Sequence, residues 1–477
     1  MGYQKAGERT NNITASLLGT VTALKNETQR LWIKQPLATF TGTTADASEG
    51  IVVSNGVITE TLRQGQSPSG QIDSVFDARQ HVLLPGLVNS HHHFYQTLTR
   101  AMPEAINKKL FDWLTSLYSV WAQLTPEMIY SASQVALVEL LQSGCTTTAD
   151  HHYIFSNELE NAIDIEVEAA KAIGCRVVLA RGSMSLGQED GGLPPSQTVQ
   201  CAKTIMEDSE RVIKEFHDRG SGALVQIALA PCSPFSVSED LMESTSKLAK
   251  KLDVRLHTHL AETQDEETFC LQRFGLRPLE YLEKVGWLHS GTWIAHGIHF
   301  NREEIAQLGS AKLGITHCPT SNMLLGSGIC RGVELEHAGA VMGIGVDGSA
   351  SNDSGNMIAE VRQAMYLQKL RYSSENFTHL DALRWATSGS ASVLGRTDIG
   401  KLEVGACADL TLFKLDEVAF AGSHDPLAAL LLCQAHRADC VMVGGQWRVK
   451  DREVIGVDVE RLVARQRELS RQLTKAG

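Results

Sequence analysis

Hydrophobic and polar positions follow two different periods along this chain. Between residues 31 and 58, short apolar runs are separated by turn-forming residues, and Ser54-Asn-Gly56 is typical of a hairpin. Short strands separated by glycines return at residues 400–413 and 440–449. We therefore expect β-structure at both ends of the chain.

Between these ends the pattern changes to alternating strands and helices. Apolar runs of strand length lie at residues 146–150, 176–180, 225–230, 254–260, 292–296, 314–318 and 341–346. Longer stretches with helical period lie at residues 126–143, 158–173, 198–219 and 238–251. Repeated strand–helix units predict a parallel sheet, and their number predicts an α/β protein with a closed (β/α)8, or TIM, barrel.

These patterns divide the chain into three parts. Residues 1–84 and 396–477 supply strands that we expect to pair into one small β-sandwich, and residues 85–395 form the barrel. Residues 1–30 show no pattern and are assigned to a loosely ordered extension. The last segment, residues 459–475, has the period of an amphipathic helix.

Composition limits the classes of partner. The 477-residue chain has 55 acidic and 43 basic residues and a net charge of −12. Phosphate binding needs a basic surface, so we expect no nucleic-acid partner. No apolar run approaches the roughly 20 residues that span a bilayer, and residues 1–12 lack the apolar core of a signal peptide. Ten cysteines without a C-x-x-C pair indicate reduced thiols, so we expect a cytoplasmic protein with a small-molecule substrate.

Three histidines at the end of an apolar run are the first candidate metal ligands. The run at residues 82–88, broken at Pro85-Gly86, has the character of a buried strand and leads to His91-His92-His93. Side chains alternate along a strand, so His91 and His93 point to the same side and can bind one metal ion. His92 points elsewhere. A single His-x-His pair is a weak signal and needs further ligands.

A second strand ends in Leu256-His257-Thr-His259-Leu-Ala-Glu262. His257 and His259 share a face, and His259, nearer to the C-terminal end of the strand, is the better ligand candidate. Glu262 can leave the strand and carry protons between a water and a substrate. The plain alternative is an ordinary strand end with an exposed glutamate.

Two further strands end in His296 and Asp347. His296 is a candidate electrophile or water-positioning group, and the plain alternative is a structural histidine. Asp347 begins a polar loop that is alternatively a cap. As a ligand beside three histidines, Asp347 would leave room for a water, as a catalytic zinc or iron site requires. The candidate ligands are His91, His93, His259 and Asp347.

These clusters, in this order, resemble the amidohydrolase superfamily. The matching stretches are Pro85-Gly-Leu-Val-Asn-Ser-His-His-His93, His259-Leu-Ala-Glu262, His296, Asp347-Gly-Ser-Ala-Ser-Asn352 and the closing Gly400-x-Leu-x-x-Gly-x-x-Ala-Asp409-Leu. The resemblance implies a distorted (β/α)8 barrel flanked by a β-sandwich built from both chain ends. The chain offers no candidate for the bridging lysine of the binuclear members. The pairing of His259 with Glu262 is similar to the mononuclear deaminases, which act on purine, pyrimidine, pterin or triazine rings.

Four stretches, at residues 91–100, 181–195, 230–235 and 346–352, are similar to bacterial deaminases of an oxidised guanine. The resemblance implies hydrolysis of 8-oxoguanine to urate and ammonia. It also implies one divalent metal ion, zinc before iron, and a homo-oligomer of two or more chains. Related enzymes share the triple-histidine segment, so other substrates stay open. The alternatives are isoxanthopterin or another pterin, guanine, and a hydroxytriazine that loses an amine or chloride.

The resemblance further implies catalytic roles. Asp347 takes a proton from the water, Glu262 protonates the ring nitrogen beside the amino-bearing carbon, and His296 hydrogen-bonds to the tetrahedral centre. The competing class is a metal-stabilised binding or scaffold protein. A structural metal site is closed by its ligands and has no use for a proton carrier such as Glu262.

The candidate contacts to a heteroaromatic substrate are Gln96, Tyr95, Trp113, His152 and Arg181. Gln96 occupies the place of a glutamine that contacts the purine in guanine deaminases. The other four lie on loops or strand ends that we expect to face the pocket. Trp113 is alternatively a packing residue, Arg181 an ion-pair partner, and His152 a support for the ligands.

Overall fold

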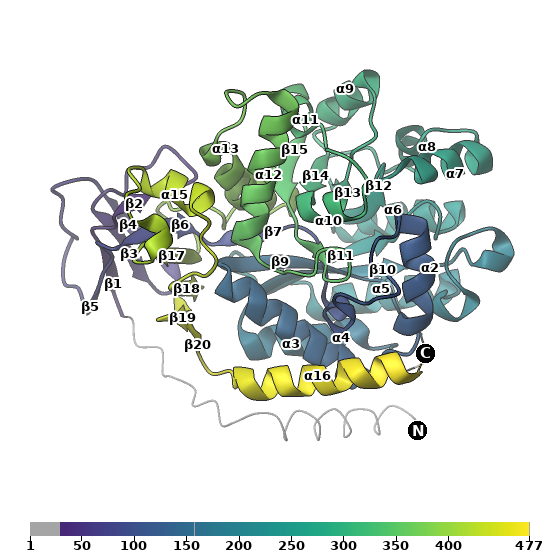
Figure 1. Cartoon of the computed structure of the whole chain (residues 1–477), viewed down its shortest axis with the longest axis horizontal. Helices are drawn as coiled ribbons and strands as arrows, with labels where there is room; N and C mark the ends of the chain where they lie inside the picture. The colour runs from purple at the N-terminus through teal and green to yellow at the C-terminus, as the bar shows by residue number, and fades with distance from the viewer. Residues whose placement is uncertain (1–28, 157, 477) are drawn as a thin grey trace.

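The computed structural model describes residues 29–156 and 158–476, and within them eight parallel strands form one sheet that curves into a barrel (Figure 1). Neighbours follow the order β15, β14, β13, β12, β11, β10, β9, β7. The strands are β7 (Leu87–Asn89), β9 (Cys145–His152), β10 (Arg176–Ser183), β11 (Val225–Pro231), β12 (Leu256–Leu260), β13 (Thr292–His296), β14 (Gly314–His317) and β15 (Val341–Ile344). The predicted (β/α)8 barrel is confirmed.

Helices cover the outside of the barrel (Figure 1). They include α2 (Leu110–Trp121), α3 (Pro126–Gln142), α4 (Ala162–Ile173), α5 (Ala202–Phe216), α6 (Glu239–Leu252), α7 (Gln264–Phe274), α8 (Pro278–Lys284), α9 (Arg302–Ser310), α10 (Pro319–Leu324), α11 (Gly332–Ala338), α12 (Met357–Tyr372), α13 (His379–Arg384) and α14 (Ser390–Val393). Capping residues set their bounds: Thr125 accepts a hydrogen bond from the N–H of Met128 at the start of α3, and Gly174, with φ of 74°, ends α4. The helix expected from residue 198 begins later, at Ala202, because a 3-10 turn occupies Ser196–Thr198.

The two ends of the barrel sheet meet beside the candidate ligands. The N–H of Ser90 donates to the carbonyl oxygen of Ile344 at 3.0 Å. Two short strands, β8 (His92–His93) and β16 (Asp347–Gly348), then pair in parallel with Asp347 opposite His92. Closure of the barrel therefore places the first histidine cluster next to the last candidate ligand.

Both chain ends build the sheets beside the barrel. In the described part of the chain, one sheet has the order β4 (Val57–Leu62), β3 (Gly50–Ser54), β1 (Leu31–Lys34), β5 (Ser74–Asp77). The other sheet has the order β2 (Ala38–Thr39), β6 (His81–Pro85), β17 (Leu410–Lys414), β18 (Cys440–Val443), β19 (Gln446–Lys450), β20 (Glu453–Val454). Along the chain, helix α15 (Pro426–Leu432) lies between β17 and β18, and helix α16 (Val459–Ala476) follows β20. Residues of both ends, such as Ile51, Leu83 and Leu410, share one apolar core. The predicted hairpin at Asn55-Gly56 is confirmed, with positive φ of 52° and 77° at its two central residues. Residues 1–28 of the expected extension lie outside the described residues.

The apolar run at residues 82–88 is shared between two sheets. Its first half forms β6 in the end sheet and its second half forms β7 in the barrel. Gly86 stands at the junction, where a Cβ atom would lie 2.0 Å from Thr146 Oγ1. Only glycine fits this approach, so Pro85-Gly86 marks the passage of the chain from one layer to the other.

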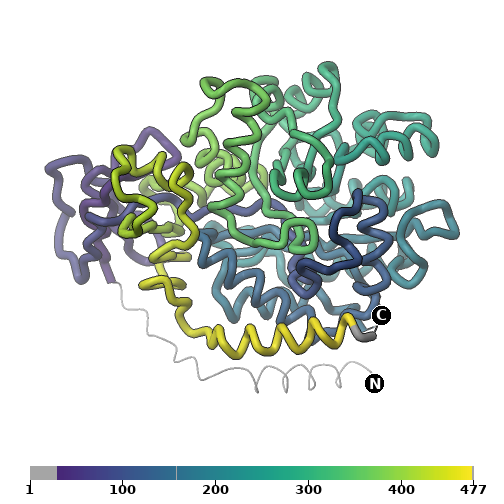
Figure 2. The backbone as a smooth tube through the Cα atoms, viewed as in Figure 1, coloured from purple at the N-terminus to yellow at the C-terminus, as the bar shows by residue number. Residues whose placement is uncertain are grey.

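The C-terminal helix α16 runs back along the barrel and lies beside α3 (Figures 1 and 2). Gln466 donates through Nε2 to Thr97 Oγ1 at 3.1 Å and accepts from Ser131 Oγ at 2.8 Å. Ser470 Oγ donates to the carbonyl oxygen of Leu98 at 2.7 Å. The last helix thus holds the turn η1 (Phe94–Thr99), which follows the triple-histidine segment.

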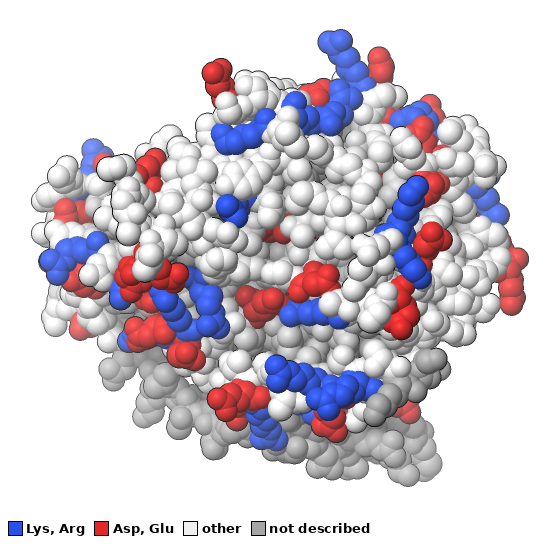
Figure 3. All heavy atoms as spheres, viewed as in Figure 1, with Lys and Arg blue, Asp and Glu red and all other residues white. Residues whose placement is uncertain are grey.

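The visible surface carries charges of both signs. Lys and Arg side chains are mixed with Asp and Glu over the face shown in Figure 3. Among the described residues, no helix is both long and apolar enough to cross a lipid bilayer.

A buried ion pair joins the barrel to the end sheets. Arg176, at the start of β10, donates from Nε and Nη2 to the two carboxylate oxygens of Asp409 at 2.9 and 3.0 Å. The N–H of Gly444 donates to the same carboxylate at 2.7 Å. Both charged side chains are at most 2% exposed. Asp409, the aspartate of the closing sequence motif, therefore has a structural role.

We expect Asp409→Asn to lower the free energy of unfolding by about 3–5 kcal/mol, because it leaves the Arg176 guanidinium buried without a counter-charge. Thermal unfolding followed by circular dichroism measures the change. The matched control is Asp77→Asn, which breaks a solvent-exposed pair with Arg79 and is expected to leave the melting temperature unchanged. Equal melting temperatures for the two variants would contradict this account.

Candidate active site

Three imidazoles and one carboxylate meet at the C-terminal edge of the barrel. Asp347 Oδ1 lies 3.2 Å from His91 Nε2 and 3.4 Å from His93 Nε2. His93 Nε2 lies 3.2 Å from His259 Nε2. All four side chains are buried. The structure therefore brings the four candidate ligands together around one point.

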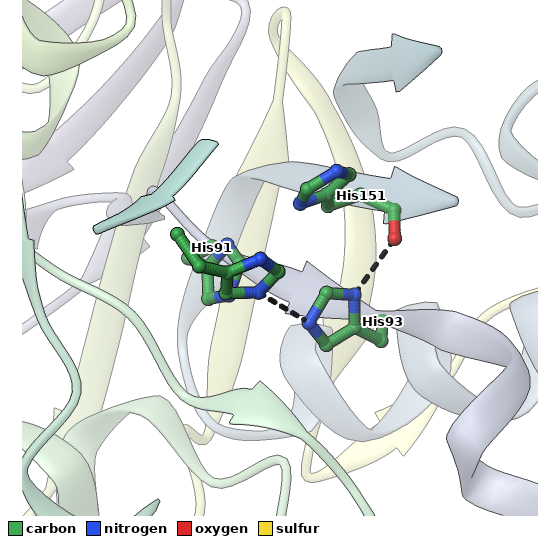
Figure 4. Close-up of side chains that lie close together, drawn as sticks. His91, His93 and His151 are labelled. Atoms are coloured by element: carbon green, nitrogen blue, oxygen red, sulfur yellow. Dashed lines mark hydrogen bonds between the residues drawn. The ribbon is translucent and has the colours of Figure 1, made fainter. Parts of the chain in front are cut away.

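Hydrogen bonds on the outer side of two rings fix their tautomers. His93 Nδ1 donates to the carbonyl oxygen of His151 at 2.7 Å (Figure 4). His259 Nδ1 donates to the carbonyl oxygen of Cys232 at 2.7 Å. A carbonyl oxygen only accepts, so each Nδ1 carries the proton and each Nε2 presents a lone pair toward the other candidate ligands.

His257 fixes the tautomer of the third ring. Its Nδ1 donates to the carbonyl oxygen of Trp293 at 3.1 Å, which leaves its Nε2 as an acceptor. That Nε2 lies 2.8 Å from His91 Nδ1, so His91 donates there and presents its own Nε2 lone pair inward. Three lone pairs and a carboxylate thus face one another with no proton between them, which is the donor set of a zinc or iron site.

Protonation states support the same donor set. Burial lowers the pKa of His91 well below its ordinary value and that of His259 to about 3, so both rings are neutral. Burial opposes the ionisation of Asp347, but the contacts with His91 and His93 outweigh it and hold the pKa of Asp347 well below its usual value. Neutral imidazoles and an ionised carboxylate are the forms that bind a cation.

Glu262 and His296 adjoin the donor set. His296 Nε2 lies 3.4 Å from Glu262 Oε2 and 3.8 Å from Asp347 Oδ2. Burial, and then the negative charge of Asp347, raise the pKa of Glu262 well above its ordinary value. Its Oε1 has no hydrogen-bond partner among the described residues. Glu262 is therefore a protonated, buried acid beside an ionised aspartate.

The backbone at these positions is held in an uncommon conformation. His296 and Asp347 have φ of 74° and 65°, in the left-handed region that favours glycine. Ala261, just before Glu262, also has a positive φ, 52°. The carboxylate of Glu266 accepts from the N–H groups of Ala261 and Glu262 at 2.9 and 3.0 Å. Such conformations persist only when surrounding contacts enforce them, and they gather at functional sites.

A cavity opens next to these groups. Its lining is His93, Gln96, Leu110, Trp113, Leu114, Tyr118, Tyr153, Cys232, Phe235, His259, Glu262, His296, Leu325, Asp347 and Ser351. Apolar and aromatic walls with a few polar groups suit a flat heteroaromatic molecule. Among the described residues, no lysine belongs to this lining.

Comparison with known proteins agrees with this geometry. The family model described as "Amidohydrolase family" matches residues 82–448. The chain belongs to the amidohydrolase family.

Individual amidohydrolases resemble the chain over most of its length. The 8-oxoguanine deaminase of Pseudomonas aeruginosa is 63% identical over 92% of this chain and 98% of its own. An isoxanthopterin deaminase from an unknown prokaryote is 31% identical over 84% of this chain and 88% of its own. The crystal structure of an atrazine chlorohydrolase from Arthrobacter aurescens, complexed with zinc, has a TM-score of 0.87 and 31% identity, and covers 92% of this chain and 100% of its own.

Two of the expected substrate contacts lie at the amidohydrolase cavity. Gln96, on η1, accepts from the N–H of Ala350 at 3.3 Å, and its Nε2 has no partner among the described residues. It packs on Gly348, where a Cβ atom would lie 1.9 Å from Gln96 Oε1. Trp113 forms a cavity wall and donates from Nε1 to the carbonyl oxygen of Ala350 at 3.0 Å.

The other three expected contacts lie away from the lining. Arg181 is fully buried and donates to Asp208 at 2.9 Å. His152 Nδ1 lies 3.0 Å from Glu166. Tyr95 packs edge-on against other aromatic rings behind η1. The expectation that these residues face the pocket is corrected, because Arg181 and His152 belong to strands whose alternation turns them outward.

Sequence reasoning missed several residues of the site. Alternation placed His257 on the ligand face, but its hydrogen bond to His91 depends on the neighbouring strand and has no local signal. Asn322, from α10, accepts from His296 Nδ1 at 2.9 Å. Tyr118 and Tyr153 line the cavity. Tyr118 lies in a helix whose period indicates only a buried face.

We expect elemental analysis to find about one divalent ion per chain, because the donors surround a single point. His259→Ala removes one of three nitrogen donors and is expected to lose most of the metal. His337→Ala, at an exposed position of α11, is the matched control and keeps it. About two ions per chain in the parent protein would contradict a mononuclear site.

Proposed function

We propose that this amidohydrolase removes the amino group of 8-oxoguanine by hydrolysis and releases urate and ammonia. The observation that carries the proposal is the 63% identity to the Pseudomonas aeruginosa 8-oxoguanine deaminase over 98% of that protein. The geometry is consistent with such chemistry, because a metal donor set, a buried acid and an ionised base surround one cavity.

The metal site is assigned to His91, His93, His259 and Asp347. Their nitrogen and carboxylate donors fit one divalent ion, with zinc before iron. Such an ion lowers the pKa of a bound water toward neutrality when it is present. His257 and the two backbone carbonyls described above hold the imidazoles in the orientation that binding requires.

The proton transfers are assigned to three side chains. Glu262 is protonated and donates to the ring nitrogen beside the amino-bearing carbon, which makes that carbon electrophilic. Asp347 is ionised and accepts a proton from the attacking water. His296, within 3.8 Å of both carboxylates, hydrogen-bonds to the tetrahedral centre. Asp347 then returns its proton to the amino group, which leaves as ammonia, and the hydroxyl of the tetrahedral centre gives its proton back to Glu262.

Substrate recognition is assigned to the amide of Gln96 and the walls of the cavity. The unpartnered Nε2 of Gln96 donates to the edge of the pyrimidine ring. Trp113 and Phe235 pack against the faces of the heterocycle. Isoxanthopterin and triazines are less favoured as substrates than 8-oxoguanine. The relatives named for a pterin and for atrazine share 31% identity with this chain, compared with 63% for the 8-oxoguanine deaminase.

We further propose that the protein acts in the cytoplasm on a small molecule and associates as a homo-oligomer of two or more chains. Its net charge of −12 also argues against a nucleic-acid partner. Size-exclusion chromatography with light scattering measures the assembly, and a monomeric mass would contradict that part of the proposal.

A panel of substrates tests the assignment. We expect kcat/KM for 8-oxoguanine to exceed that for guanine, isoxanthopterin and a hydroxytriazine, as measured by ammonia release. A site whose polar groups match the edge of one ring disfavours rings that leave those groups unpaired. Preference for the pterin would overturn the substrate assignment and leave the deaminase chemistry in place.

We expect Glu262→Gln to keep the metal and bind substrate but to lower kcat by about 100-fold or more, the usual scale for a lost general acid. The amide keeps the size of the side chain and removes its transferable proton. Glu303→Gln, at an exposed position of α9, is the matched control and is expected to turn over normally. Near-normal kcat for Glu262→Gln would assign the proton to another group.

A further inference from the structure

One buried hydroxyl at the cavity has no role in the chemistry assigned so far. Tyr118 lies in α2, is 1% exposed and lines the cavity. Its hydroxyl has no hydrogen-bond partner among the described residues. A buried hydroxyl without a partner costs free energy, so native structures normally supply a protein group, a water or a ligand. The cavity is the place from which such a partner can come.

Helix α2 presents one face to the cavity. Leu110, Trp113, Leu114 and Tyr118 follow the helical spacing of a single stripe, and all four line the cavity. Two are aliphatic, and the indole N–H of Trp113 is already bound to the carbonyl oxygen of Ala350. The hydroxyl of Tyr118 is therefore the polar group that this wall offers to a ligand.

The other polar groups of the cavity have partners or assigned roles. Ser351 Oγ donates to the carbonyl oxygen of Gly348 at 3.3 Å, and it accepts from Ser321 Oγ at 3.0 Å. Cys232 lies beside a candidate ligand, with its Sγ 3.8 Å from His259 Nδ1. Gln96, Glu262, His296 and the metal donors act at the reacting ring. Two tyrosine hydroxyls of the lining remain, those of Tyr118 and Tyr153, and of the two it is Tyr118 whose hydroxyl is buried without a hydrogen-bond partner among the described residues.

The substrate presents a matching acceptor. In 8-oxoguanine the reacting carbon lies in the six-membered ring, and the C8 oxygen lies at the opposite end of the molecule, in the five-membered ring. Guanine has only a C–H group at that position. When the reacting carbon lies against the metal donors, the C8 edge extends into the part of the cavity that belongs to neither the donors nor Gln96.

We propose that the hydroxyl of Tyr118 donates a hydrogen bond to the C8 oxygen of 8-oxoguanine and thereby selects the oxidised purine over guanine, an inference that rests on the proposed function. Burial raises the pKa of Tyr118 well above its ordinary value, so the hydroxyl keeps its proton and acts as a donor. Tyr118 is thus a specificity residue on α2, one of the two helices between the first and second barrel strands.

The turn at residues 232–235 is the alternative place at which the two purines could be distinguished. Cys232 and Phe235 do line the cavity. Phe235 has no polar atom on its ring, and burial raises the pKa of the Cys232 thiol to about 12, so it is a neutral and weak donor. A tyrosine hydroxyl is the stronger donor to a carbonyl oxygen.

The test is Tyr118→Phe, which removes one oxygen and keeps the ring. We expect the ratio of kcat/KM for 8-oxoguanine to that for guanine to fall about tenfold, the effect of one ordinary hydrogen bond. Urate and xanthine differ at C8 and are not deaminated, so calorimetry can measure their dissociation constants directly. We expect the preference for urate over xanthine to fall by a similar factor in Tyr118→Phe. Gln96→Ala, in contrast, is expected to weaken both purines to a similar degree and leave the ratio unchanged.

The matched control is Tyr281→Phe. Tyr281 is also buried, its hydroxyl also lacks a partner among the described residues, and it stacks on Phe274 away from the cavity. Removal of the Tyr281 hydroxyl is expected to leave the kcat/KM ratio of the two purines unchanged. The dissociation constants for urate and xanthine are expected to stay the same as well. Thermal unfolding of Tyr118→Phe is expected to match the parent, because the hydroxyl has no protein partner to lose.

Other outcomes overturn the inference in distinguishable ways. If the parent protein prefers 8-oxoguanine and Tyr118→Phe keeps that preference, the C8 oxygen is bound elsewhere and this proposal alone fails. If the ratio of kcat/KM for 8-oxoguanine to that for guanine falls in Cys232→Ala and does not change in Tyr118→Phe, recognition of the C8 oxygen belongs to the thiol. If the parent protein does not deaminate 8-oxoguanine, both this proposal and the proposed function fail.

Discussion

The structure depends on one electrostatic constraint: three imidazole lone pairs and an ionised carboxylate face the same buried point. Lone pairs directed at a carboxylate repel it unless a cation lies between them, and burial strengthens that repulsion. Each ring is nevertheless held in this tautomer by a hydrogen bond on its outer side. A metal ion that satisfies this set therefore contributes directly to the stability of the barrel as well as to chemistry.

The same constraint explains the contacts around the site. His91 and Asp347 lie at the two ends of the barrel sheet, so a shared ion ties β7 to β15 where their backbone pairing is sparse. Helix α16 holds η1, and the Arg176–Asp409 pair fastens the end sheets to β10. These contacts lie outside the cavity, and they hold the turn that follows the first ligands and a strand of the same sheet. Precise placement of the ligands therefore depends on residues that no substrate contacts.

Strand period and strand order were enough to predict the barrel and the residues that gather at its C-terminal edge. The ends of parallel strands meet at one edge, so the strand assignment placed His91, His93, His259 and Asp347 at the same edge of the barrel. Their meeting around one point is seen only in the structure. The exact strand ends were not predictable. Residues 151 and 152 were expected to follow β9 and residue 181 to follow β10, but both strands continue through them. Alternation then turns His152 and Arg181 toward the outer helices. Tyr118 could not be identified either, because a cavity-facing residue of a helix has the same period as a core residue.

Two carboxylates close to one imidazole have opposite protonation states, and this difference assigns their chemistry. Burial opposes the ionisation of Glu262, whose Oε1 has no hydrogen-bond partner among the described residues, and the negative charge of Asp347 adds to that effect. Asp347 is equally buried, but its contacts with His91 and His93 keep its pKa well below the usual value, so it stays ionised. A shared environment thus yields an acid and a base a few ångströms apart, as a hydrolytic exchange of an amino group for a hydroxyl requires. Burial is the larger cause of the neutral state of Glu262 and the charge of Asp347 adds to it, so losing Asp347 would lower the pKa of Glu262.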